Sequence, residues 1–172
     1  MRHRLFVLLL AWPSCIAACD GGREAARPPV PGAVADRIVV EKAARRMHLQ
    51  RAGTTLKSYR IALGRDPVGH KQQEGDSRTP EGLYMIDARN PQSRFHLSLR
   101  VSYPNAADRR RASARGLAPG GDIFIHGSPN GMAAESFVAG RDWTDGCIAV
   151  SNAEIREIWA MVKDGTPIEI RP

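Results

Sequence analysis

Residues 122–152 carry the features that decide the fold of this 172-residue chain: DIFIHGSPNGMAAESFVAGRDWTDGCIAVSN. The stretch opens with an apolar run, Asp122–His126, of the kind found in buried strands, and it closes on a helix signal. Ser151 and Glu154 are spaced as a capping box, and the apolar residues behind them recur at helical spacing. Because Cys147 lies between the two signals, we expect a strand, a cysteine and a helix in succession.

Strand-like segments account for much of the remaining chain. Three short runs are typical of consecutive antiparallel strands: Arg37–Glu41, Met47–Arg51 and Leu56–Leu63. Phe95–Tyr103 alternates apolar and polar residues, which predicts that one side faces the core and that His96, Ser98 and Arg100 lie on the other side. Two shorter runs, Leu83–Ile86 and Pro167–Arg171, also read as strands.

Loops and helices take up the rest of the folded part. Residues 64–80 are polar and bear glycines, so we expect a long loop, and residues 106–115 are expected to form a short basic helix. Strands thus outnumber helices. The sequence predicts a mainly β fold, a β-sandwich or barrel with a few short helices, one directly after Cys147.

The N-terminal segment has the layout of an export signal. Arg2 and Arg4 precede an apolar run that is too short to span a bilayer as a helix. Residues 16–19, Ile-Ala-Ala-Cys, resemble the bacterial lipobox, in which Cys19 becomes the lipid-modified first residue of the mature chain; ordinary signal-peptidase cleavage is the alternative. We therefore expect a lipoprotein signal at 1–18, a flexible tether rich in Pro, Gly and Ala at 19–36, and one folded domain at 37–172.

This leader implies a location and leaves one thiol available. Asp20 after the cysteine resembles the signal that keeps lipoproteins on the inner membrane facing the periplasm; a soluble periplasmic protein is the alternative. Cys15 leaves with the leader and Cys19 is consumed by lipid, so Cys147 has no intrachain partner. A lone thiol in an oxidising compartment favours a reactive group, and a buried apolar cysteine is the alternative.

The charge and the metal-ligand pattern narrow the class of partner. The net charge of +7 favours anionic neighbours such as lipid headgroups or cell-wall carboxylates. The basic cluster at 109–115 lacks interleaved aromatic residues, so we do not predict nucleic-acid binding. The chain has no His-x-x-x-His and no second available cysteine at ligand spacing, so neither a metal nor another cofactor is predicted. The sequence does not indicate an oligomeric state.

A thiol acts as a nucleophile when one group takes its proton and another stabilises the oxyanion it creates. His126 is the candidate general base because it stands where a strand ends at a glycine. Gly146 leaves room for an acyl carbonyl and lets backbone N–H groups face it as an oxyanion hole. The nearby helix start is expected to favour the thiolate form of Cys147. His70 lies in the long loop, where it could reach the site or remain exposed to solvent.

The segments Ile125-His126-Gly127 and Thr144-Asp145-Gly146-Cys147-Ile148 together resemble the catalytic signature of the L,D-transpeptidase family with the YkuD-type domain. Residues 75–82 and 102–105 resemble its YafK-like subgroup. The resemblance implies the YkuD-type β fold and attack by Cys147 on a peptidoglycan stem peptide, at the carbonyl of the diamino acid in its third position. The residues that we expect to help bind this substrate are Gly127, Thr144, Asp145, Arg141, Tyr103 and His70.

Two departures from the common pattern concern the substrate and the second half-reaction. Asp145 and Ala149 stand where many members have a histidine and an arginine, so Arg141, Arg100 or Arg78 would have to supply a cation. The thioester can be resolved by an amine, which is transpeptidation, or by water, which makes the enzyme a carboxypeptidase or amidase. A non-catalytic wall-binding lipoprotein is the alternative from another class. Papain-like and NlpC-type peptidases place the cysteine before the histidine, the reverse of the order here.

Overall fold

The computed structural model describes residues 32–131 and 141–172. The predicted leader, the lipidated Cys19 and most of the tether lie outside the described residues, so these remain predictions. Within the described part of the chain, no helix is long and apolar enough to cross a membrane.

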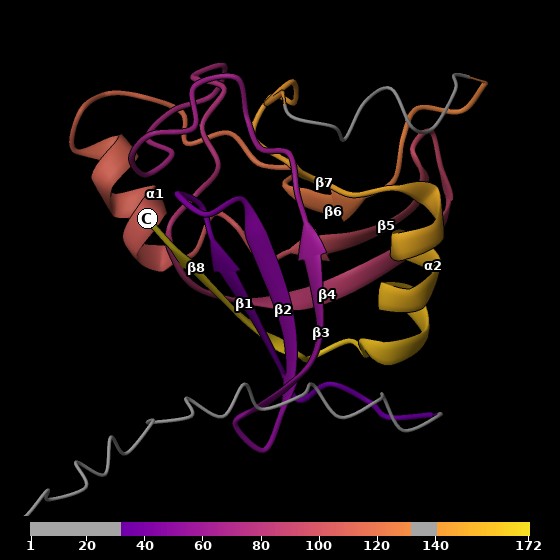
Figure 1. Cartoon of the computed structure of the whole chain (residues 1–172). Coiled ribbons are helices and arrows are strands. Elements are labelled where there is room, and N and C mark those ends of the chain that lie inside the picture. The colour runs from indigo at the N-terminus through magenta and orange to yellow at the C-terminus, as the bar shows by residue number, and fades with distance from the viewer. Residues whose placement is uncertain (1–31, 132–140) are drawn as a thin grey trace, which may run out of the picture.

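The described residues form eight strands in a single sheet with the order β3-β2-β1-β8-β4-β5-β6-β7 (Figure 1). Most neighbours in the sheet are antiparallel, whereas the pairs β1–β8 and β6–β7 are parallel. The strands are β1 Arg37–Glu41, β2 Arg46–Arg51, β3 Thr54–Arg60, β4 Gly82–Ser93, β5 His96–Val101, β6 Phe124–His126, β7 Ile148–Ala149 and β8 Pro167–Arg171.

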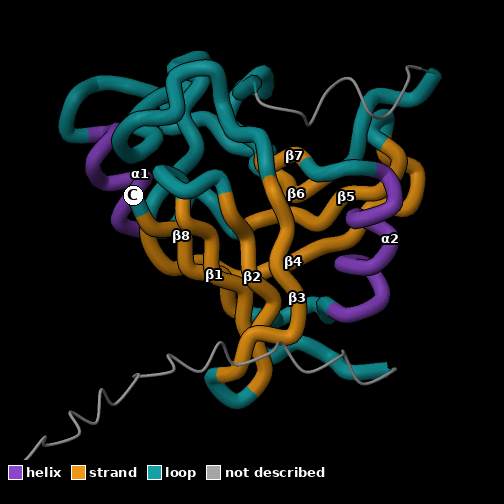
Figure 2. The backbone as a smooth tube through the Cα atoms, viewed as in Figure 1, coloured by secondary structure: helices purple, strands orange, loops and turns teal. Residues whose placement is uncertain are grey.

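The sheet curls so that the two ends of its strand order come together. Ala62, just past β3, forms an isolated antiparallel bridge with Ala149 of β7, and Gly64 forms a parallel bridge with Thr144. The Ala62 N–H donates to the Ala149 carbonyl at 2.9 Å, and the reciprocal bond measures 2.8 Å. The result is a half-barrel, which confirms the predicted mainly β class, and its loops gather at the end where β6 and β7 lie (Figure 2).

The core lies inside this curl and is closed by helix α2, Asn152–Met161. Ile155 and Ile158 of α2 are fully buried and join the core cluster formed by the strands. The predicted capping box is confirmed: Ser151 Oγ accepts from the Glu154 N–H at 3.2 Å, and the Glu154 carboxylate accepts from the Ser151 N–H at 2.8 Å. The two-residue strand β7 lies between Cys147 and α2, so the helix starts after this strand rather than at the cysteine itself.

Several strands differ from the predicted bounds, and the differences in β4 and β5 bear on the pocket. β4 runs from Gly82 to Ser93, well beyond the predicted Leu83–Ile86. The sequence pattern did not show the second half of the strand, because that half is polar and two register shifts in its pairing with β5 interrupt the alternation of apolar and polar residues. In β5 the expected polar face is not simply solvated. Ser98 is only 4% exposed, since it pairs in register with His126 of β6.

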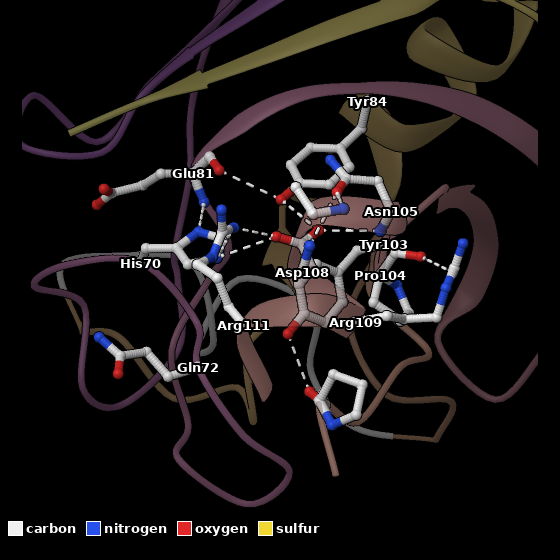
Figure 3. A network of polar contacts seen from close by, with 12 residues as sticks. His70, Gln72, Glu81, Tyr84, Tyr103, Pro104, Asn105, Asp108, Arg109 and Arg111 are labelled. Atoms are coloured by element: carbon white, nitrogen blue, oxygen red, sulfur yellow. Dashed lines mark hydrogen bonds and ion pairs between the residues drawn. The ribbon is translucent and has the colours of Figure 1, made fainter. Parts of the chain in front are cut away.

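A buried carboxylate, Asp108, joins helix α1, Ala106–Ser113, to the long loop and to β4 (Figure 3). Asp108 Oδ2 accepts from the Tyr84 hydroxyl at 3.0 Å and from the Asn105 N–H at 2.9 Å. Its Oδ1 atom contacts His70 Nε2 at 3.2 Å and also pairs with Arg111. His70 is therefore a structural member of this network.

We expect Asp108→Ala to lower the free energy of unfolding by about 3–5 kcal/mol, because removing one partner leaves the others buried without an acceptor. Urea unfolding followed by circular dichroism measures the change. Asp87→Ala is the matched control: its carboxylate pairs with Arg100 on the surface at 2.8 Å, and we expect a loss of about 0.2–1 kcal/mol. Equal losses in the two variants would contradict a structural role for the Asp108 network.

Candidate active site

His126 and Cys147 come together because β6 and β7 are parallel neighbours. His126 is paired directly with Ala149, and Cys147 lies two residues before Ala149, which places its side chain on the same face of the sheet. Both residues line one pocket of about 420 Å³. The structure therefore brings the predicted nucleophile and the predicted base to the same cavity.

The His126 imidazole is held in one tautomer. Its Nδ1 atom lies 2.6 Å from the carbonyl of Gly127, and because a carbonyl only accepts hydrogen bonds, Nδ1 carries the proton and Nε2 keeps the lone pair. The ring is 3% exposed and packs against Phe95, with 4.5 Å between centroids, and edge-on against Trp143 at 5.7 Å. Burial lowers the pKa of His126 below its ordinary value, so the ring is neutral at neutral pH.

The Cys147 thiol is protonated in the resting structure. Burial, together with the negative charges of Asp145 and Asp122, raises the pKa of the thiol to about 11, although a hydrogen bond from the Phe124 backbone acts in the opposite direction. Sγ lies 3.5 Å from the carbonyl of Asp122, to which it donates. The expectation that the helix start favours the thiolate is therefore wrong for the resting state, since strand β7 intervenes and burial dominates. A neutral thiol and a neutral imidazole suit general-base transfer during attack.

The turn before the nucleophile is fixed by Thr144. Its hydroxyl donates to the Cys147 carbonyl at 2.8 Å and accepts from the Gly146 N–H at 3.1 Å. This corrects the expectation that the Gly146 N–H serves the oxyanion, because that donor is already engaged. Within the described residues, the Cys147 N–H donates no hydrogen bond, so it is the donor available for an oxyanion.

Gly146 is needed for its conformation and its lack of a side chain. Its φ is +125°, and an added Cβ would lie 2.6 Å from the Arg78 carbonyl oxygen of the long loop and 3.1 Å from Ile123 Cδ1. We expect Gly146→Ala to displace the Cys147 turn and to destabilise the protein by about 1–3 kcal/mol.

Thermal unfolding and the rate of Cys147 alkylation measure the two effects of this substitution. Gly53→Ala is the matched control, because Gly53 also has a positive φ of +78° but meets nothing within 4 Å. A loss in Gly146→Ala no larger than in Gly53→Ala would show that the contact with the loop does not matter.

The other predicted substrate residues do not line this pocket. Asp145 is exposed and pairs with Arg65, and Arg141 is exposed beyond the pocket lining. Gly127 lies against helix α2, where an added Cβ would meet Asn152 and Ile155.

Tyr103 and His70 belong to a different part of the molecule, which is shown in Figure 3. Their rings make an edge contact at 6.4 Å, and the Tyr103 hydroxyl donates to the Pro119 carbonyl at 2.9 Å. The structure thus places both residues in the packing around α1 rather than beside Cys147.

Several residues of the pocket were not singled out from the sequence. The lining includes polar and charged side chains from the β4–β5 hairpin and from the entrance to β6: Asn90, Gln92, Ser93, Arg94, Ser98 and Asp122. The polar second half of β4 and the alternation in β5 are the signals that could have indicated a functional surface. Arg78 and Arg100, named as possible cations, are instead paired with Asp66 and Asp87 at 2.8 Å.

Comparison with known proteins decides the family. The family model of the L,D-transpeptidase catalytic domain, YkuD, matches residues 35–170. The chain belongs to the L,D-transpeptidase family. A relative from Escherichia coli (strain K12), described as "Putative L,D-transpeptidase YafK", is 32% identical over 109 residues, which cover 62% of this chain and 37% of that protein.

Solved structures agree with this L,D-transpeptidase fold. The helical cell shape determining protein Pgp2 from Campylobacter jejuni superimposes with a TM-score of 0.60 at 24% identity, over 78% of this chain and 46% of that chain. The L,D-transpeptidase from Xylanimonas cellulosilytica gives 0.52 at 15% identity, over 84% and 64%. At these identities the likeness shows the fold alone. The chain also spans less than half the length of YafK and of the Pgp2 chain.

Proposed function

We propose that this protein is a cysteine-dependent L,D-transpeptidase that acts on peptidoglycan stem peptides through a thioester. The observation that carries the proposal is that Cys147 and a neutral His126, whose proton is on Nδ1, line the same pocket. Membership of the L,D-transpeptidase family supports the class of substrate. The activity would serve cell-wall cross-linking or remodelling.

The first half-reaction follows from the atoms of the site. Sγ of Cys147 attacks the carbonyl carbon of the third residue of the stem while its proton passes to His126 Nε2. The carbonyl oxygen becomes an oxyanion and accepts from the Cys147 N–H. When the intermediate collapses, the carbon–nitrogen bond breaks and His126 returns the proton to the departing amine. The product is a thioester on Cys147.

The second half-reaction determines the biological role. The lone pair of an incoming neutral amine attacks the thioester carbonyl while His126 Nε2 takes a proton from the amine. The carbon–sulfur bond then breaks, and His126 returns the proton to Sγ, which restores the thiol. If water attacks instead, the protein is an L,D-carboxypeptidase or an amidase acting on the same type of bond. We favour the amine because the family is defined by transfer, and the experiment below separates the two outcomes.

We further propose that the reaction takes place on the periplasmic face of a bacterial membrane, to which the chain is tied by a lipid on Cys19. The basic residues, the apolar run and the lipobox-like residues of the leader support this location. Its natural partner is peptidoglycan, and a soluble periplasmic form is the alternative.

Mass spectrometry of purified stem peptides incubated with the protein, with and without an added amine acceptor, tests the proposed function. We expect a cross-linked or amine-exchanged product only when the acceptor is present, and none with Cys147→Ala. A hydrolysed product that is insensitive to the acceptor would assign the hydrolase. Binding of the peptide without any product would assign the non-catalytic wall-binding protein.

A further inference from the structure

We propose that Arg94 and Asp122 form an opposite-charge subsite that binds the zwitterionic end of the diamino acid in the donor peptide. Arg94 would hold the terminal carboxylate of that side chain, and Asp122 its ammonium group. The inference rests on the proposed function and adds the residues that select the donor. It also supplies the cation that the sequence lacks at Ala149.

Arg94 is the arginine that the structure places in the catalytic pocket. It lies in the turn between β4 and β5, it is exposed, and it lines the cavity together with Cys147 and His126. Within the described residues, its guanidinium makes no hydrogen bond or ion pair, whereas Arg78 and Arg100 are both neutralised by aspartates. An uncommitted guanidinium at the wall of a cavity can form two parallel hydrogen bonds to a carboxylate.

The backbone that carries Arg94 is held in place by Asn130. The Asn130 N–H donates to the Arg94 carbonyl at 2.9 Å, and its side-chain amide donates to the Ser93 carbonyl at 3.0 Å. Its Oδ1 atom accepts from the His96 N–H at 3.0 Å. Three bonds thus tie the β4–β5 turn to the segment that follows β6. This fixed turn sets where the Arg94 guanidinium can reach, as a substrate-positioning group requires.

Asp122 supplies the negative charge on another part of the pocket wall. It adopts a positive φ of +54°, which is uncommon for a residue with a side chain and is often retained at functional positions. Its carbonyl accepts from the Cys147 thiol at 3.5 Å, while its exposed carboxylate lines the pocket. Within the described residues, this carboxylate forms no hydrogen bond or close ion pair, although its charge interacts at longer range with Arg100, which is itself paired with Asp87.

The chemistry of the ligand follows from these two charged groups, neither of which forms a close ion pair within the described residues. Among the described residues that line the pocket, Arg94 is the cation and Asp122 the anion, and the other polar side chains, His126 included, are neutral at neutral pH. A side chain that ends in both a carboxylate and an ammonium group can satisfy both. A lysine-type side chain, which ends in an ammonium group alone, leaves Arg94 without a partner.

Binding at Asp122 would also act on the nucleophile. The negative charge of Asp122 is one of the causes that raise the pKa of the Cys147 thiol. An ammonium group beside that carboxylate offsets its field at Sγ, so a donor that fills the subsite makes the thiol easier to deprotonate. The subsite therefore couples recognition of the donor to the readiness of Cys147.

Two synthetic stem peptides that differ only at the third residue test the subsite in the full chain. One carries diaminopimelate, which ends in a carboxylate and an ammonium group, and the other carries lysine. We expect the wild type to favour the diaminopimelate peptide in kcat/KM. Arg94→Gln should lower kcat/KM for that peptide about 10- to 100-fold and leave the lysine peptide unchanged, and Arg94→Lys should restore part of the loss.

Asp122→Asn tests the anionic half of the subsite. Because both peptides present an ammonium group, this variant should lose activity towards both of them. Arg51→Gln removes the same charge at a surface position outside the pocket and should leave both rates unchanged. The rate at which neutral iodoacetamide alkylates Cys147, located by peptide mapping, should stay the same in Arg94→Gln, which shows that the nucleophile is intact.

The outcomes separate this inference from the proposed function. If the wild type acts on neither peptide, the proposed function fails and the subsite fails with it. If the wild type is active and Arg94→Gln keeps the preference for diaminopimelate, or loses both peptides equally, the subsite is overturned while the proposed function stands. Loss of the preference in Arg94→Gln alone, with Arg51→Gln unaffected, supports it.

Discussion

Cys147→Ala is expected to abolish thioester formation and turnover while the fold is retained. The substitution removes only sulfur from a half-buried side chain, so we expect the free energy of unfolding to change by about 1 kcal/mol or less. Activity, by contrast, depends on the nucleophile itself. Its removal should lower kcat by on the order of 10⁴-fold or more, because the acyl-enzyme no longer forms.

Two measurements check this expectation together. Mass spectrometry of stem-peptide products reports turnover, and thermal unfolding reports the fold. Cys147→Ser is the informative companion, since it keeps a small hydroxyl group at the same place but a far weaker nucleophile at neutral pH. Turnover in Cys147→Ala close to that of the wild type would exclude the thioester mechanism.

His126→Ala is expected to have the second largest effect, lowering kcat/KM for acylation by about 10²- to 10⁴-fold. In the wild type, protonated His126 cannot accept the thiol proton, so activity falls as the pH drops through the pKa of His126. Because burial lowers that pKa, the fall should occur at a lower pH than for an exposed histidine. Above it, the rate should stay level through neutral pH, since the thiol ionises only at about 11.

A kcat/KM profile against pH, recorded for the wild type and for His126→Ala, measures this. The variant should lose the acid limb and gain rate only towards alkaline pH, where the thiolate forms without a base. His48→Ala is a suitable control, because His48 lies on β2 and bonds to Ser58 at 2.8 Å outside the pocket. An acid limb that persists in His126→Ala would assign the base to another group.

The sequence predicts those parts of the fold that depend on local patterns. The bounds of β1 and β8 were predicted correctly because Arg37–Glu41 and Pro167–Arg171 are short strand-forming runs with clear ends. The capping box at Ser151 was equally readable, since it needs only two residues at fixed spacing. The length of β4 was underestimated because its second half carries polar residues that line the pocket, and because register shifts interrupt its pairing with β5.

The site residues also fall into two groups, those with a local sequence signal and those without one. His126 and Cys147 stand in short signatures, and the structure places both in one pocket. Arg94 and Asp122 carry no local signal, because their meaning depends on a hairpin turn and a strand entrance that meet only in the folded sheet. The hydrogen bond from the Gly146 N–H to the Thr144 hydroxyl could be found only in the structure, since a sequence does not show which backbone donors are already bonded.

The bridges that close the curled sheet determine when, during folding, the Cys147 pocket is assembled. The segment before Cys147 is fastened to residues near the start of the domain: the Thr144 N–H donates to the Leu63 carbonyl, and the Arg65 N–H to the Thr144 carbonyl. Contacts between such distant parts of a chain close late in folding, because the loop entropy must be overcome first. A partly folded chain would therefore carry a cysteine without its assembled pocket, and chemical competence would arise only at the last step of folding.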